Sequence, residues 1–353
     1  MGKCLITKLN GSVNNNELLR IGEMRMRIAK VENPTDATQG FGIYINKPVV
    51  LKIVDNGYFT DKTLTANKGK TITLNVGSNG VWVSNDNIEI AILDKYSITA
   101  LSVLYPNQTS ADYGLNKYFN LSDLKYSTAL ASLSAYNTQV TGDIVNLKNL
   151  TALTSLSFSN SQVTGDIANL KGLTALTYLS AYNTQVTGDI ANLKGLTALT
   201  SLGLSNTKVT GDIANLKGLT ALTSLGLSNT KVTGDIVNLK NLTRLGKELM
   251  LKGLNLSGNI GDLPNEVLFV TNKEGKGNFT WTTSSRTNIL AMENIACNNI
   301  DKLLQDMSKM NANFAGHQAY HKTISLIGTH TSAADAAVQT LQSKGYTISI
   351  TPE

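Results

Sequence analysis

The pentapeptide Val-Thr-Gly-Asp-Ile recurs through the middle of this 353-residue chain at a fixed interval. Its copies begin at Val140, Val163, Val186, Val209 and Val232, each 23 residues after the one before. Self-similarity at a period on the order of 20 to 50 residues is typical of chains that stack one small structural unit on the next. A unit this short buries little alone and needs neighbours on both sides. The repeat therefore predicts an elongated stack of coils.

Apolar residues recur in register in every unit. One unit reads LTSLGLSNTKVTGDIANLKGLTA, and its apolar positions are Leu199, Leu202, Leu204, Val209, Ile213, Leu216 and Leu219. Stacking the units turns each position into a ladder of buried side chains. The short LxLx segment alternates with period 2, which predicts a parallel strand on the concave face that adds about 4.8 Å of length per coil.

Two polar rows follow this strand. One carries hydroxyls that can bond neighbouring backbone groups: Thr138, Ser161, Thr184, Thr207 and Thr230. The other, one residue earlier, consists of Asn137, Asn160, Asn183, Asn206 and Asn229. The sequence leaves open which of the two rows turns inward.

A Gly-Asp pair lies in every copy of the pentapeptide, just before its final isoleucine. The pairs are Gly142 and Asp143, Gly165 and Asp166, Gly188 and Asp189, Gly211 and Asp212, and Gly234 and Asp235. Glycine allows the positive φ that a turn requires here. Stacked carboxylates about 5 Å apart repel one another, so we expect each to cap the N–H groups of a short convex helix. A ladder of bound cations is the alternative, although repeat-borne calcium sites use more oxygens per ion.

The unit resembles the leucine-rich repeat, in which LxxLxLxx(N/T)xL precedes a variable half. The Val-Thr-Gly-Asp-Ile turn is similar to the Leu-Thr-Gly-x-Ile-Pro turn of plant-type leucine-rich repeats, and the whole unit resembles short leucine-rich repeat proteins of gut anaerobes and their phages. The resemblance covers residues 97–263, with regular coils over about 130–244. It implies an α/β-type leucine-rich repeat solenoid used for binding, and it carries no catalytic residues.

Residues 1–96 form a different pattern, made of short alternating runs separated by Asp-Asn-Gly and Ser-Asn-Gly. These are strand and hairpin signals, and they predict an N-terminal all-β, sandwich-like domain. Such a domain could anchor the protein and form a homo-oligomer.

Residues 264–353 predict a C-terminal α/β cap. Helical spacing relates Met292, Ile295, Ile300, Leu303 and Met307. Further on, TISLIGT reads as a strand, a capping box at Ser332 opens a helix that Gly345 closes, and YTISI reads as another strand. A right-handed strand–helix–strand unit of this kind would extend the solenoid sheet over its last coil.

Charge and targeting signals restrict the partners. The net charge of +6 is spread over 37.8 kDa with only five arginines, which gives little support for nucleic-acid binding. The two cysteines, Cys4 and Cys297, form no disulfide framework. No apolar run near the amino terminus reads as a signal peptide, and none elsewhere is long enough to cross a membrane. We therefore expect synthesis in the cytoplasm without export and no membrane partner.

Few residues could carry chemistry. His317 and His321 stand at i, i+4, but no Glu follows His317 as zinc peptidases require, and no third ligand is evident. Cys297 falls on an apolar stripe that we assign to a helix. The sequence thus predicts no enzyme activity, no metal and no cofactor.

The concave face is the better candidate for function. Its candidate ligand-binding residues are Tyr136, Tyr178 and Tyr182, with Ser134, Ser157 and Ser180 beside them. An exposed tyrosine can stack on a sugar or seat a protein side chain. The alternative is that these are ordinary strand residues on a spacer.

The leading hypothesis is a structural or adhesive protein, a phage virion surface or fibre protein whose solenoid rod is displayed to bind surface glycan or protein. The alternative is a bacterial leucine-rich repeat protein, cytoplasmic in that case, that mediates protein–protein or glycan interaction.

Overall fold

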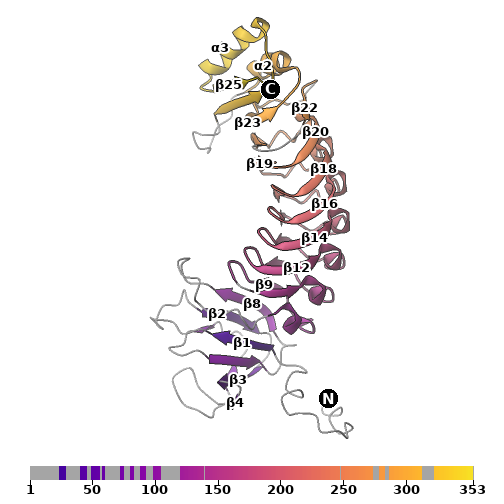
Figure 1. The fold of residues 1–353 in the computed structure, drawn as a ribbon, viewed down its shortest axis with the longest axis vertical. Coiled ribbons are helices and arrows are strands. Elements are labelled where there is room, and N and C mark those ends of the chain that lie inside the picture. The colour runs from indigo at the N-terminus through magenta and orange to yellow at the C-terminus, as the bar shows by residue number, and fades with distance from the viewer. Residues whose placement is uncertain are drawn as a thin grey trace.

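The computed structural model describes residues 120–352 except 139, 247, 273–277, 283–285 and 312–321, and before residue 120 it describes only the paths of eight strands. Figure 1 shows the repeats as a curved stack. The thirteen-stranded sheet lies toward the inner side of the curve, and a seven-stranded sheet with short helical turns lies toward the outer side.

Each LxLx segment forms one strand of the thirteen-stranded sheet, as the sequence predicts. Leu133, Leu156, Leu179, Leu202 and Leu225 stand in one register row. The strands are β9 (Ser132–Ser134), β11 (Ser155–Ser157), β13 (Tyr178–Ser180), β15 (Ser201–Gly203) and β17 (Ser224–Gly226), followed by β19 (Glu248–Met250) and β21 (Phe269–Thr271). All of these pair in parallel. The leucine row is buried, so the predicted ladder is confirmed.

The pentapeptide forms a second parallel sheet, where the sequence predicts only a turn at the Gly-Asp pair. Its seven strands are β10 (Thr141–Asp143), β12 (Gln162–Asp166), β14 (Gln185–Asp189), β16 (Lys208–Asp212), β18 (Lys231–Asp235), β20 (Asn255–Asn259) and β22 (Asn278–Thr280). Pairing with the next coil keeps the segment extended through Asp, although each glycine has a φ between 107° and 113° in the regular coils. The turn prediction is therefore corrected to a strand that contains a positive-φ glycine.

A single 3₁₀ turn follows each of the first six of these strands, from η3 to η8. They are η3 (Ile144–Leu147), η4 (Ile167–Leu170), η5 (Ile190–Leu193), η6 (Ile213–Leu216), η7 (Ile236–Leu239) and η8 (Ile260–Asp262), and η2 (Leu121–Leu124) precedes them. In each four-residue turn from η3 to η7 the first and last side chains are buried. The short convex helices are thus 3₁₀ rather than α, which fits their length.

The C-terminal part continues the thirteen-stranded sheet. Its elements are β23 (Ala291–Ala296), α2 (Ile300–Ser308), β24 (Thr323–Ile327), η10 (Ser332–Ala334), α3 (Asp335–Ser343) and β25 (Thr347–Thr351). The expected strand–helix–strand unit is present, with β24 and β25 parallel. Thr331, not Ser332, caps the first turn, through a bond from the N–H of Ala333.

The predicted helical stripe in this part is wrong at its start. Met292 and Ile295 lie on the strand β23, and only Ile300, Leu303 and Met307 lie on α2. A spacing of three suits a helix, but here Asn294 has a φ of 54° and the strand register shifts between Met292 and Ile295. Both side chains are therefore buried on an irregular strand.

Before the repeats, β8 (Ile98–Leu104) pairs in parallel with β9 and so begins the coil stack. β2 (Gly40–Ile45) and β6 (Gly80–Trp82) extend the same sheet with antiparallel pairing. A five-stranded antiparallel sheet contains β1 (Met24–Ile28), β3 (Val49–Asp55), β4 (Tyr58–Phe59), β5 (Ile72–Leu74) and β7 (Ile88–Ile92). The sandwich-like N-terminal domain and its boundary at residue 96 stay predictions.

Candidate binding surface

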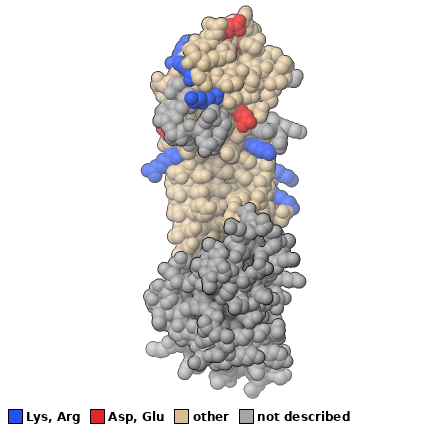
Figure 2. All heavy atoms as spheres, turned by 90° about the vertical axis from the view of Figure 1, so that its left-hand side faces the viewer, with Lys and Arg blue, Asp and Glu red and all other residues tan. Residues whose placement is uncertain are grey.

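The solvent-facing row of the thirteen-stranded sheet is small and uncharged over five coils. Beside the tyrosines it offers Ser132, Ser155, Ser201, Gly203, Ser205, Ser224, Gly226 and Ser228. Figure 2 views the molecule from the side that carries this sheet, and the Lys and Arg side chains that can be seen beside the uncovered repeats lie toward the margins. The middle of this face thus offers shape and hydroxyl groups rather than charge.

Three tyrosines interrupt this small-residue face and form what we term the tyrosine cluster: Tyr136, Tyr178 and Tyr182. Tyr136 is 43% exposed and Tyr178 is 40% exposed, while Tyr182 is half-buried. The rings of Tyr136 and Tyr182 have centroids 6.0 Å apart and planes tilted by 56°. This distance and tilt are typical of a favourable aromatic pair.

A buried serine lets these two rings meet. Tyr136 and Tyr182 occupy the same position two coils apart, and Ser159 holds that position in the coil between them. The Ser159 side chain is fully buried. Its hydroxyl lies 2.7 Å from the Ser180 hydroxyl and accepts the backbone N–H of Tyr182 at 3.1 Å. We infer that the rings close over Ser159, and that a larger side chain there would separate them.

The cluster perturbs the ionisation of Tyr182. Burial, followed by the hydrogen bond with Tyr136, raises the pKa of Tyr182 to about 12. The phenol is therefore neutral at physiological pH, and its hydroxyl can both donate and accept a hydrogen bond.

Two of the predicted ligand-binding serines are not available. Ser157 is 9% exposed and Ser180 is 5% exposed, whereas Ser134 is half-buried. The hydroxyl of Ser180 bonds that of Ser159 in the previous coil. The exposed part of the candidate surface therefore comprises the tyrosine cluster and Ser134, and a binding role for the six predicted residues stays a prediction.

The Asp row lies elsewhere, at the ends of the seven-stranded sheet, and each carboxylate caps a 3₁₀ turn. Oδ1 of Asp143, Asp166, Asp189, Asp212 and Asp235 accepts the N–H two residues on at 2.7 to 2.8 Å. The glycine of the next coil lies close to this oxygen. Among the described residues, no three His, Cys, Asp or Glu side chains gather to hold a metal ion. The capping bonds that the sequence predicts are therefore present in all five regular coils.

The two polar rows separate to opposite sides of the chain. The hydroxyl row turns inward, and Thr184 Oγ1 donates to the carbonyl of Ala181 at 2.6 Å. The Asn row turns outward with a φ near 55° and forms an amide ladder, in which Asn206 Nδ2 donates to Asn183 Oδ1 at 2.6 Å. This ladder was missed in the sequence, although a repeated Asn after the strand was its visible signal.

Of the three residues considered for catalysis, the structure describes only Cys297. His317 and His321 lie outside the described residues. Cys297 follows the strand β23 rather than lying on a helix, and it is 5% exposed. Burial raises the pKa of its thiol to about 12, which leaves almost no thiolate for nucleophilic attack at neutral pH.

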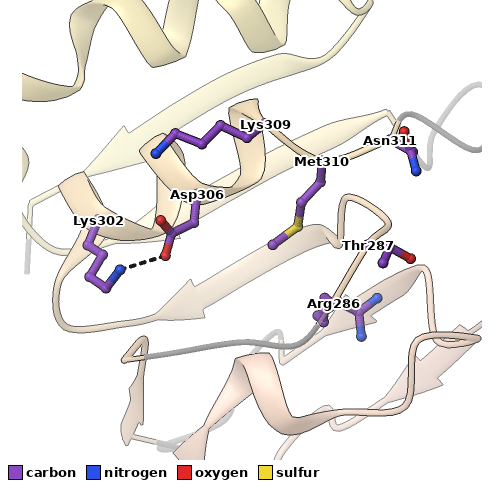
Figure 3. Close-up of a pocket in the computed structure, with 7 residues that line it drawn as sticks. All are labelled: Arg286, Thr287, Lys302, Asp306, Lys309, Met310 and Asn311. Atoms are coloured by element: carbon purple, nitrogen blue, oxygen red, sulfur yellow. Dashed lines mark hydrogen bonds and ion pairs between the residues drawn. The ribbon is translucent and has the colours of Figure 1, made fainter.

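A pocket of about 520 Å³ in the C-terminal part is lined by four charged residues, Arg286, Lys302, Asp306 and Lys309, and by Thr287, Met310 and Asn311 (Figure 3). Lys302 pairs with Asp306 at 2.8 Å, and Asp306 also accepts the indole N–H of Trp281 at 2.9 Å. The guanidinium of Arg286 donates to the carbonyls of Leu263 and Pro264. Its burial lowers the pKa of Arg286 to about 10. Arg286 thus joins neighbouring coils, and Asp306 joins α2 to Trp281.

Comparisons with known proteins find partly similar solved structures but no matching family. No family model and no curated protein matches the chain. Solved structures similar to it include an internalin (inlF) from Listeria monocytogenes, at 28% identity over 56% of this chain and 58% of that one, with a TM-score of 0.43. The plant peptide hormone receptor RGFR1 in complex with RGF2 matches at 22% identity over 65% and 40%, with a TM-score of 0.44. A plant ice-binding protein matches at 18% identity over 72% and 84%, with a TM-score of 0.47.

The chain thus spans about three fifths of that internalin and two fifths of that receptor. The 23-residue pattern and its two parallel strand ladders make the repeat region a leucine-rich repeat solenoid. In the part of the chain that the structure describes, no helix has the length and apolar character needed to cross a bilayer.

Proposed function

We propose that this leucine-rich repeat solenoid is a non-enzymatic binding protein that holds a protein partner on the tyrosine cluster. The observation that carries the proposal is the gathering of three tyrosines on a face that is otherwise small and uncharged. Tyrosine buries a large ring with little loss of side-chain entropy and keeps a polar tip, which is why it is enriched among interface anchors.

The position of the cluster within the repeat strengthens this proposal. Where Tyr136 and Tyr182 stand, the other three regular coils have Ser159, Ser205 and Ser228. Serine replaces tyrosine without disturbing the coil at these positions, so the fold does not require the rings. The small residues of the following coils leave room for a partner to approach the backbone beside the rings.

Peptides selected from a displayed random library against the intact chain test the proposal. We expect Tyr178→Ser and Tyr182→Ser to weaken the selected peptides about tenfold or more, as interface anchors do. Both changes copy the serine of neighbouring coils. Tyr126→Ser is the matched control, because Tyr126 is 49% exposed but lies outside the sheet. Equal losses in all three variants would contradict the proposal, and glycans that bind only with the cluster intact would replace protein as the partner.

The proposal extends to where the protein acts. An elongated solenoid with a binding face suits a displayed rod, so a virion surface or fibre protein is our candidate, with a bacterial interaction protein as the alternative. Attachment through an oligomer of the N-terminal domain belongs to the same proposal. Mass spectrometry of purified particles from an infected culture distinguishes the two, because detection in uninfected cells and absence from particles would reject the virion role.

A further inference from the structure

The strand β25 is the last strand at the C-terminal end of the thirteen-stranded sheet. It pairs with β24 on one edge, and among the strands that the structure describes none pairs with its other edge. Figure 1 shows β25 below α3 at this end of the molecule. An open edge presents backbone N–H and C=O groups to any strand of matching shape.

The backbone of β25 directs alternate residues to the open edge. The N–H of Thr347 donates to the carbonyl of Lys322, and the carbonyl of Thr351 accepts the N–H of Gly328. The backbone N–H and C=O groups of both residues therefore point toward β24. Because alternate residues of a strand point their backbone groups to opposite edges, Ile348 and Ile350 offer theirs outward.

The sequence of β25, Thr-Ile-Ser-Ile-Thr, reads the same in both directions. We propose that β25 pairs antiparallel with β25 of a second copy of this chain, with Ser349 opposite Ser349 on the twofold axis. In this register Ile348 of each copy faces Ile350 of the other. Residues that face each other as a hydrogen-bonded pair exchange two bonds, so all outward backbone groups of both isoleucines are satisfied.

Charge and side-chain size agree with self-pairing. The five residues of β25 carry no charge, so no like charges oppose each other across the axis. Ile348 and Ile350 are half-buried and, like Val338 of α3, pack at the margin of the core. Each would meet an isoleucine of the partner on the same face, and four of the five residues are β-branched, which suits a strand.

A cysteine on the axis tests the register directly. Cα atoms of opposed residues that exchange no hydrogen bonds lie about 4.5 Å apart, within the range of a disulfide. Ser349→Cys should therefore form a covalent dimer under mild oxidation, above the background of the unchanged chain. Thr347→Cys is the matched control, because its two copies would lie roughly 13 Å apart. No covalent dimer in Ser349→Cys, or equal amounts in both variants, would overturn the proposal.

Opposite charges at the same position provide a second test. Ser349 is exposed, so Ser349→Lys and Ser349→Glu leave the core intact. Each variant alone opposes like charges and should raise the dimer dissociation constant by up to about fivefold in sedimentation measurements. Mixing the two should restore dimers that contain one copy of each. Ser122→Lys, an exposed serine at the opposite end of the repeats, should change nothing. Dimers that are unaffected by either charge, or no gain on mixing, would reject pairing through β25.

Discussion

Replacing Gly211 by alanine should destabilise the solenoid strongly, for two reasons that the coil geometry provides. Gly211 has a φ of +111°, a conformation that other residues adopt at a cost of about 1 to 3 kcal/mol. A Cβ atom at this position would also lie 2.2 Å from Oδ1 of Asp189 in the preceding coil. That oxygen accepts the N–H of Ala191, and the loss of such a cap costs about 1 kcal/mol. We expect Gly211→Ala to lower the free energy of unfolding by about 2 to 4 kcal/mol.

Urea unfolding followed by circular dichroism measures this effect, and Gly218→Ala in the same coil is the control. A methyl group on Gly218 would meet no heavy atom within 4 Å, and this glycine has no positive φ, so its replacement should be neutral or slightly stabilising. Combining Gly211→Ala with Asp189→Ala should cost less than the sum of the two by about 1 kcal/mol, because the clash and the cap share one carboxylate. Equal effects of Gly211→Ala and Gly218→Ala would refute the reasoning.

Three shorter predictions concern other parts of the coil stack. Asp189→Asn keeps an oxygen for the cap and should leave stability nearly unchanged, whereas Asp189→Ala should lower the free energy of unfolding by about 1 kcal/mol; calcium-dependent melting would contradict capping. Removal of residues 176–198, one whole coil, should leave a chain that unfolds cooperatively by circular dichroism, since each coil contacts only its neighbours. The pKa of Tyr182 rises from 10.0 to about 12 on folding, so its contribution to stability is present below pH 10 and is lost as the pH rises through about 12. Ultraviolet titration should show one phenol that ionises near pH 12, and Tyr136→Phe should lower the pKa of this phenol.

The sequence predicts what a fixed period alone determines. The leucine ladders follow from a spacing of 23 residues, and the position of each carboxylate directly before a 3₁₀ turn follows from the preference of Asp for helix N-caps. The second sheet could not be foreseen, because Gly-Asp is a turn signal in isolation. Only the equivalent segment of the adjoining coil, which pairs with it in parallel, keeps it extended.

The candidate surface also depends on contacts between coils that the sequence pattern of one coil does not predict. Tyrosines on the strand face are visible in the sequence, but the contact between Tyr136 and Tyr182 depends on a two-coil separation across Ser159. The burial of Ser180 depends on a hydroxyl that arrives from the previous coil. Exposure at a given repeat position therefore varies with the neighbours above and below, which the pattern of one coil does not contain.

Pairing through β25 would place two tyrosine clusters on the same side of one continuous sheet. The twofold axis between antiparallel strands runs perpendicular to the sheet, so it does not turn one copy over. Tyr178 lies on β13, seven strands from β25, and the two copies of its ring would be roughly 70 Å apart along the sheet. A surface that carries many copies of a selected peptide should therefore hold the disulfide-linked Ser349→Cys dimer about 100-fold more tightly than the reduced chain at low concentration, while the affinity for free peptide stays the same. Equal affinity for the peptide-coated surface before and after reduction of the disulfide would show that the two tyrosine clusters cannot bind that surface at the same time.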